Sequence, residues 1–151
     1  MAFQPPMHPL ACASDVAKRL HDAGIQPTRQ RIAIAQVLLS APVHMAADDI
    51  LLAARAVFPR LSRATVYNTL PLLVEQGLLR ALRLDPERTV YDSRTEPHSH
   101  IYHEDTGMVE DLPAQMLQWQ ALPQIASDLE LVGMDLIVRV RQRQPSNASS
   151  Q

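Results

Sequence analysis

The chain has 151 residues, of which 46% are hydrophobic and 20% charged, so it can bury a core and is not a disordered tail. Its net charge is -2, but residues 1–88 carry ten basic and seven acidic side chains, whereas residues 89–151 carry four basic and nine acidic. This asymmetry favours a nucleic-acid binder joined to a different module. A single cysteine, Cys12, excludes an internal disulfide and a zinc site built from several cysteines of one chain.

The first elements expected are two helices. Residues 1–13 contain three prolines and are predicted to be flexible, as is the tail at 144–151. Ser14 is expected to cap a helix that runs to about Ala23, where Gly24 ends it in a left-handed conformation. Thr28 is expected to cap a second helix over 29–40, which Ala41-Pro42 stops.

Two further helices and a hairpin follow. The third helix is expected from about Ala47 to Val57 and the fourth over 63–76, capped by Ser62 and closed by Gly77. Pro71 lies inside the fourth helix and predicts either a kink or a short first segment. The β-like runs 78–84 and 89–93, joined by DPER, predict a hairpin.

Helices followed by a hairpin predict a winged helix-turn-helix over residues 14–91. Residues 92–143 predict a small α/β domain: strands at 98–103 and 107–111 around a turn, a helix over 116–129 broken by Pro123, and a strand over 131–140. The whole chain is therefore expected to be of the α+β class.

The fourth helix has the side chains that a DNA-recognition helix needs near its N-terminus, and asparagine can pair with adenine. Basic residues at the second helix and on the hairpin (Arg80, Arg83 and Arg88) suit phosphate contacts. Two alternatives to DNA binding remain for these residues. The arginines can form an ordinary solvated face, or the winged helix can be an adaptor that binds protein. The candidate DNA-binding residues are Arg29, Arg31, Arg63, Thr65, Tyr67 and Asn68.

Three of the six histidines, His98, His100 and His103, fall within six residues. In a strand, His98 and His100 point to one face, and carboxylates flank them on both sides. Nitrogen and oxygen ligands without sulfur suit iron(II), manganese(II) or zinc. The alternative for a single histidine is a surface or capping role, which we assign to His8 and His21.

Several motifs occur together: RQR after GIQPT, ATVYNTL, EQGLL before the hairpin, and HSH followed by a turn and VED. In this combination the chain resembles the ferric uptake regulator family, metal-responsive dimeric bacterial transcription factors, from about Ala17 to Arg143. It is most similar to the iron response regulator branch, because it has ATVYNTL, lacks cysteine pairs, and carries MDLIVRVRQRQ near its end, at residues 134–144.

The resemblance implies one divalent metal per chain, iron(II) or manganese(II), with zinc as an alternative. One implied ligand is an aspartate after the turn, which corresponds to Asp111. Glu110 is the alternative for this ligand, since strand alternation lets only one of the two side chains face inward. The family's structural zinc site of four cysteines is absent, because His103 and Thr106 replace its first pair. A further site is not expected, because it needs ligands at Pro97 and Ser99. The implied metal ligands are His44, Asp92, His98, His100 and Asp111.

The resemblance also implies function. We expect a cytoplasmic homodimer, formed through residues 92–143 and without membrane contact, that binds an inverted-repeat DNA operator and responds to iron or haem status. Cys12 precedes Ala13 rather than proline, so a Cys-Pro haem motif is missing and haem contacts would fall on His98, His100 and His103. A peroxide-sensing repressor of the same family is the alternative, and a non-haem iron enzyme is less favoured.

Overall fold

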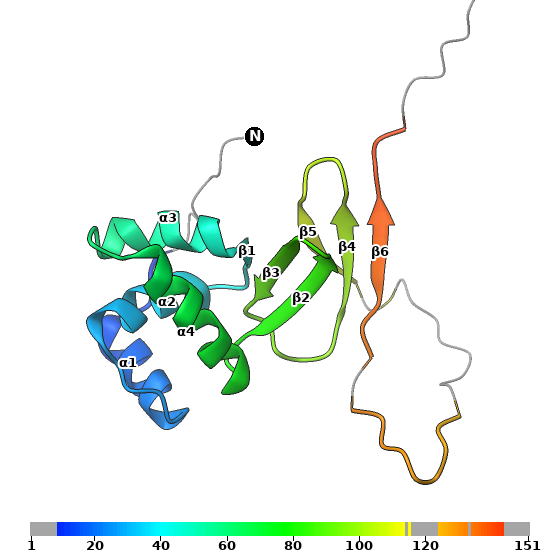
Figure 1. The fold of residues 1–151 in the computed structure, drawn as a ribbon, viewed down its shortest axis with the longest axis horizontal. Helices are drawn as coiled ribbons and strands as arrows, with labels where there is room; N and C mark the ends of the chain where they lie inside the picture. The colour runs from blue at the N-terminus through cyan, green and yellow to red at the C-terminus, as the bar shows by residue number, and fades with distance from the viewer. Residues whose placement is uncertain (1–8, 114, 116–123, 133, 144–151) are drawn as a thin grey trace, which may run out of the picture. The chain divides into compact units, whose positions relative to one another are not determined.

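The computed structural model describes residues 9–113, 115, 124–132 and 134–143. By their internal contacts these residues divide after Thr95 into two units, which we describe separately. The N-terminal unit contains α1 (Ala13–Asp22), α2 (Arg29–Leu39), β1 (His44–Ala46), α3 (Ala47–Val57), α4 (Arg63–Glu75), β2 (Arg80–Asp85) and β3 (Arg88–Asp92) (Figure 1).

Local capping signals explain half of the helix boundaries in this unit. Thr28 Oγ1 accepts a hydrogen bond from Arg31 N at 3.3 Å, and Ser62 Oγ accepts one from Thr65 N at 3.0 Å, which confirms both predicted caps. Gly24 and Gly77 have φ values of 77° and 71°, the left-handed conformation predicted for them.

One predicted detail of the helices is wrong, and one of the two alternatives predicted at Pro71 is excluded. The N-cap of α1 is Cys12, so Ser14 lies inside the helix rather than at its cap, because the helix begins two residues earlier than expected. No short first segment precedes Pro71, since α4 is continuous over Arg63–Glu75. Pro71 is tolerated because the other side of the helix packs into a core that includes Leu70 and Leu73.

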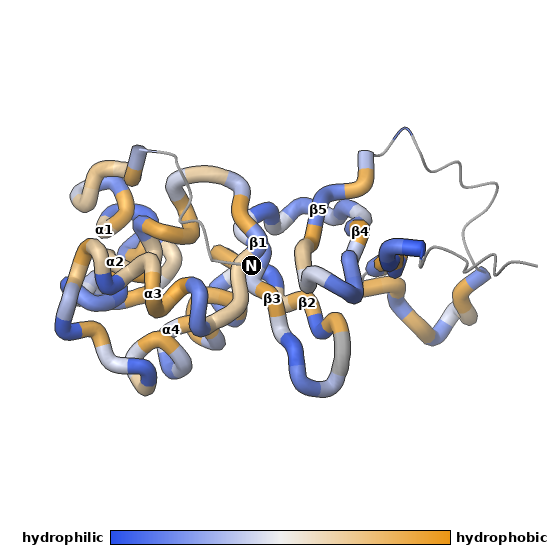
Figure 2. Tube along the Cα trace, turned by 90° about the horizontal axis from the view of Figure 1, so that it is seen from above, coloured by the Kyte–Doolittle hydropathy of each residue, from blue (hydrophilic) through white to orange (hydrophobic). Residues whose placement is uncertain are grey.

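The core of the N-terminal unit is aliphatic and lies among its helices. In Figure 2, apolar stretches alternate with polar ones along α2, α3 and α4, as expected for helices with one buried face. The fully buried side chains include Leu20, Ile34, Leu38, Ile50 and Leu70.

A small sheet completes this unit, in the strand order β1-β3-β2. The β2–β3 hairpin confirms the predicted wing. The sequence did not predict β1, which pairs antiparallel with β3 and places His44 opposite Asp92. The winged helix-turn-helix is therefore confirmed, with an additional strand on its sheet.

The second unit contains β4 (Ser99–His103), β5 (Val109–Leu112) and β6 (Ile137–Val140), in the order β5-β4-β6 (Figure 1). The β4–β5 pair is antiparallel, as predicted, and β6 runs parallel to β4. The predicted strand over 131–140 is wrong in its first half, because only its last residues have β4 as a partner.

The helix expected over 116–129 falls largely outside the described residues. Its described part, 124–129, is not helical and contains a turn at Ser127–Asp128. No helix in the described ranges has the length and apolar character needed to cross a membrane.

Candidate functional site

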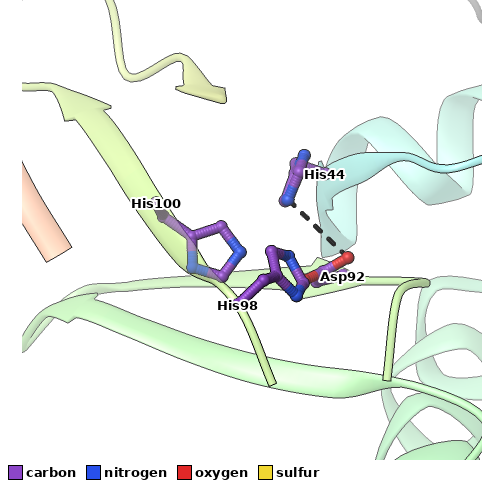
Figure 3. Close-up of side chains that lie close together, drawn as sticks. All are labelled: His44, Asp92, His98 and His100. Atoms are coloured by element: carbon purple, nitrogen blue, oxygen red, sulfur yellow. Dashed lines mark ion pairs between the residues drawn. The ribbon is translucent and has the colours of Figure 1, made fainter. Parts of the chain in front are cut away.

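The first pair of candidate metal ligands lies on the sheet of the N-terminal unit. His44 begins β1 and Asp92 ends β3, and the strand register places them opposite each other. Nε2 of His44 is 3.6 Å from Oδ1 of Asp92, whose side chain is fully buried (Figure 3). A buried carboxylate needs compensating contacts, so this pair is a candidate for binding a cation.

Backbone contacts hold that pair in place. Arg94 N donates a hydrogen bond to Oδ1 of Asp92 at 2.8 Å. Next to it, Ser93 Oγ accepts from Val43 N at 2.9 Å and donates to Ala41 O at 3.1 Å. Ser93 directly follows Asp92, and its hydrogen bonds reach the residues that precede His44. These bonds help to keep β1 and β3 in register.

The second group of candidate ligands lies in the C-terminal unit. His100 lies on β4 opposite Asp111 on β5, and His98 immediately precedes β4. Nε2 of His98 is 3.1 Å and Nε2 of His100 3.9 Å from Oδ1 of Asp111. The two imidazole rings are 4.3 Å apart between centroids, so one carboxylate serves two adjacent histidines.

The tautomer of His98 suits metal binding. Its Nδ1 lies 2.7 Å from the carbonyl oxygen of Glu96. A carbonyl oxygen can only accept, so Nδ1 carries a hydrogen, and Nε2 is the ring nitrogen that faces Asp111. A backbone acceptor on the other ring nitrogen is a common feature of metal-bound histidines.

Strand alternation separates the remaining candidates. Glu110 lies on the opposite face of β5 from Asp111, and its Oε1 is 2.6 Å from Nε2 of His103. The structure therefore places Asp111, rather than Glu110, beside His98 and His100. His103 points away from His100 on β4, so the three histidines suggested for haem do not share one face of the strand.

The candidate DNA-binding residues on α4 differ in their surroundings. Arg63, Tyr67 and Asn68 are exposed. Thr65 is partly engaged in the helix cap, because its Oγ1 is 2.8 Å from Ser62 Oγ. The exposed side chains of Arg63, Tyr67 and Asn68 give this helix a polar face of the kind that base and phosphate contacts require.

The two arginines that begin α2 also differ. Arg29 is exposed. Arg31 is half-buried, and its Nη1 donates to the carbonyl of Gln26 at 3.1 Å. Arg29 is therefore the more accessible of the two for a phosphate.

Sequence reasoning missed two residues. Asp48 belongs to none of the sequence motifs, but its carboxylate contacts both Arg63 and Tyr67. Ser93 carried no motif at all. Neither contact has a sequence signal, because each joins positions 15 or more residues apart.

Comparison with known proteins identifies relatives of this chain. The model of the ferric uptake regulator family matches residues 22–139. The peroxide-responsive repressor PerR of Staphylococcus aureus is 34% identical over 113 residues, 74% of this chain and 76% of the relative. The peroxide operon regulator of Bacillus subtilis is 35% identical over 97 residues, 64% of this chain and 67% of the relative.

Solved structures give the same fold. The ferric uptake regulator of Pseudomonas aeruginosa, determined with manganese, has a TM-score of 0.64 and 26% identity, and the match covers 85% of this chain and 98% of that one. This likeness confirms the α+β class, with a winged-helix domain and a dimerisation domain.

Because the family consists of regulators, the enzyme alternative is excluded. The chain belongs to the ferric uptake regulator family and is a metal-responsive transcriptional regulator, of a family whose members bind DNA as dimers.

Proposed function

We propose that this protein is a repressor that binds an inverted-repeat operator as a homodimer formed through residues 92–143, and that one divalent cation per chain controls its affinity for DNA. The observation that carries the proposal is the placement of one carboxylate, Asp111, beside both His98 and His100. The proposed ligands are His44, Asp92, His98, His100 and Asp111.

The donor chemistry fits such a cation. The histidines and the aspartate, Asp92, drawn in Figure 3 offer imidazole nitrogen and carboxylate oxygen, to which Asp111 adds a further carboxylate oxygen. Three neutral imidazoles and two carboxylates suit iron(II) or manganese(II), and zinc also accepts these donors. Asp92 and His98 are six positions apart, so the connecting chain keeps their Cα atoms within about 22 Å of each other.

Regulation follows from where these ligands lie in the chain. His44 and Asp92 precede Thr95, and His98, His100 and Asp111 follow it. Ligands that share one cation lose freedom of movement relative to each other, which shifts the dimer toward the arrangement that fits the operator. A coupling of about 1–3 kcal/mol changes DNA affinity roughly 5–150-fold.

The signal in this proposal is iron status, sensed through iron(II) or through haem. Its support is the similarity of the ending MDLIVRVRQRQ to the iron response regulator branch, together with a ligand set that contains no sulfur. Such a site exchanges iron(II) more readily than a closed zinc site does.

A response to peroxide is the second candidate function. The relatives from Staphylococcus aureus and Bacillus subtilis are peroxide regulators, and Asp111 lies beside His98 as an additional carboxylate. In this case His44 or His98 would be oxidised, and the modified protein would release DNA.

One series of measurements tests both candidates. Purified protein loaded with manganese(II) is used to select genomic fragments, and binding to the recovered sequence is then titrated. The three conditions are iron(II) without oxygen, haem, and iron(II) followed by peroxide. Control of affinity by iron(II) or haem supports the iron-status proposal. A response to peroxide alone, with an added oxygen on His44 or His98 by mass spectrometry, replaces it with the second candidate.

A further inference from the structure

An acidic side chain contacts the exposed face of the proposed DNA-reading helix. Asp48 lies in the first turn of α3, and its Oδ1 is 3.1 Å from Nη2 of Arg63 and 3.4 Å from the hydroxyl of Tyr67. The Arg63 guanidinium also donates to the Tyr67 hydroxyl at 3.0 Å and lies 5.1 Å from the centroid of its ring. These contacts form a closed triangle that joins α3 to the first two turns of α4.

We infer that Asp48 is a specificity-determining residue for DNA, and this inference rests on the proposed role of α4. Its carboxylate holds the Arg63 guanidinium and the Tyr67 hydroxyl in one arrangement. It thereby competes with DNA phosphates for Arg63, and the competition lowers binding to unrelated sequences more than binding to the operator.

The contacts of this triangle contribute little to the stability of the folded protein. The side chains of Arg63 and Asp48 are 63% and 61% exposed, and exposed ion pairs are screened by water and salt. Tyr67 is 44% exposed, so its ring and hydroxyl are accessible to a ligand. The consequence of the contacts is therefore to be sought in binding rather than in folding.

Charge gives the direction of the effect. An arginine that contacts phosphate adds affinity for any DNA sequence. To reach a phosphate, Arg63 must leave Asp48 or bring the phosphate close to the carboxylate, and like charges brought together are unfavourable. At a matching sequence, base contacts by Asn68 and Tyr67 offset this cost. At other sequences nothing does, so the carboxylate raises the ratio of specific to non-specific affinity.

The test compares Asp48→Asn with Asp49→Asn. Both variants remove one negative charge from the first turn of α3, but among the described residues Asp49 contacts neither Arg63 nor Tyr67. The manganese-loaded wild-type protein first selects its preferred duplex from a random-sequence library. Fluorescence anisotropy then measures the affinity of each variant for that duplex and for poly(dI-dC) over a range of salt concentrations.

We expect Asp48→Asn to bind poly(dI-dC) about fivefold to tenfold more tightly than Asp49→Asn does, with a salt slope steeper by about one and a smaller gain on the selected duplex. In an Arg63→Ala background the difference between the two substitutions should disappear.

Two results would overturn the inference while the proposed function stands. The first is an equal ratio of affinities for the selected duplex and for poly(dI-dC) in Asp48→Asn and Asp49→Asn. The second is a difference between these variants that persists in the Arg63→Ala background. If the wild-type protein selects no sequence from the library, the proposed function fails and the inference fails with it. Thermal melting of each variant shows whether a change in affinity comes from a loss of folding.

Discussion

Oδ1 of Asp111 lies 3.1 Å from Nε2 of His98 and 3.9 Å from Nε2 of His100, so one carboxylate on β5 serves both histidines of the HSH motif. The neighbouring Glu110 points to the other face of the strand and pairs with His103. This relationship gives two adjacent acidic residues different roles, and that difference can be measured.

The Asp111→Asn variant should lose most of its affinity for manganese(II), by at least about 10-fold, because an amide oxygen carries no charge to balance the cation. Glu110→Gln is the matched control and should leave the affinity unchanged. Isothermal titration calorimetry of each variant with manganese(II) gives the affinity and the number of ions per chain. Equal losses in the two variants would remove Asp111 from the ligand set.

Ser93→Ala should weaken manganese(II) binding by about 10-fold while the protein stays folded, because loss of its hydroxyl lets the residues before His44 move relative to Asp92. Ser40→Ala is the control, since Ser40 Oγ also bonds two backbone groups, Ala11 N and Gln36 O, but has no link to Asp92. Calorimetric titration and circular dichroism separate binding from folding. A loss of affinity in Ser40→Ala as large as in Ser93→Ala would contradict this positioning role.

Asn68→Ala should relax the preference for one base in the operator by about 1–3 kcal/mol, if the side chain makes a bidentate contact with adenine. Gln76→Ala, at the other end of the same helix, should have no effect. Selection of sequences from a random duplex library by each variant shows the position at which the preference is lost. An unchanged selected sequence for Asn68→Ala would mean that another element reads the bases.

The contacts of Cys12 predict a pH dependence for its thiol. The side chain of Ser14, followed by the backbone N–H groups of Ser14 and Asp15, lowers the pKa of Cys12 below its ordinary value. A lowered pKa means that the reactive thiolate forms at lower pH. Ser14→Ala should therefore raise the pKa and move the midpoint of alkylation to higher pH.

Asp15→Asn is the control of opposite sign for Cys12, since the Asp15 carboxylate raises the pKa of the thiol and its removal should lower it. Because the chain has one cysteine, the rate of reaction with iodoacetamide as a function of pH reports on Cys12 alone. A midpoint that moves in the same direction in both variants would rule out this explanation of the shift.

Local features of the sequence determined the helices. Thr28 and Ser62 cap α2 and α4, while Gly24 and Gly77 adopt positive φ after α1 and α4. Each of these signals acts within about four residues, so it can be predicted without knowing what lies elsewhere in the chain. The same holds for the β2–β3 hairpin, whose strands are adjacent in sequence.

Contacts between distant residues were decided only by the tertiary structure. Strand β1 has three residues and exists because β3, more than forty positions later, supplies its hydrogen-bonding partner. Its propensity alone is too weak to predict it. The contact between Asp48 and Arg63 depends in the same way on how α3 packs beside α4.

The choice between Asp111 and Glu110 also depended on tertiary structure, through strand register. Alternation predicted that only one of the two would face the histidines, but a shift of one residue in the pairing of β4 with β5 would have exchanged them. The pairing of His100 with Asp111 settles which side chain lies there. Sequence patterns fix the period of a strand, whereas its register depends on packing against a partner that the pattern does not contain.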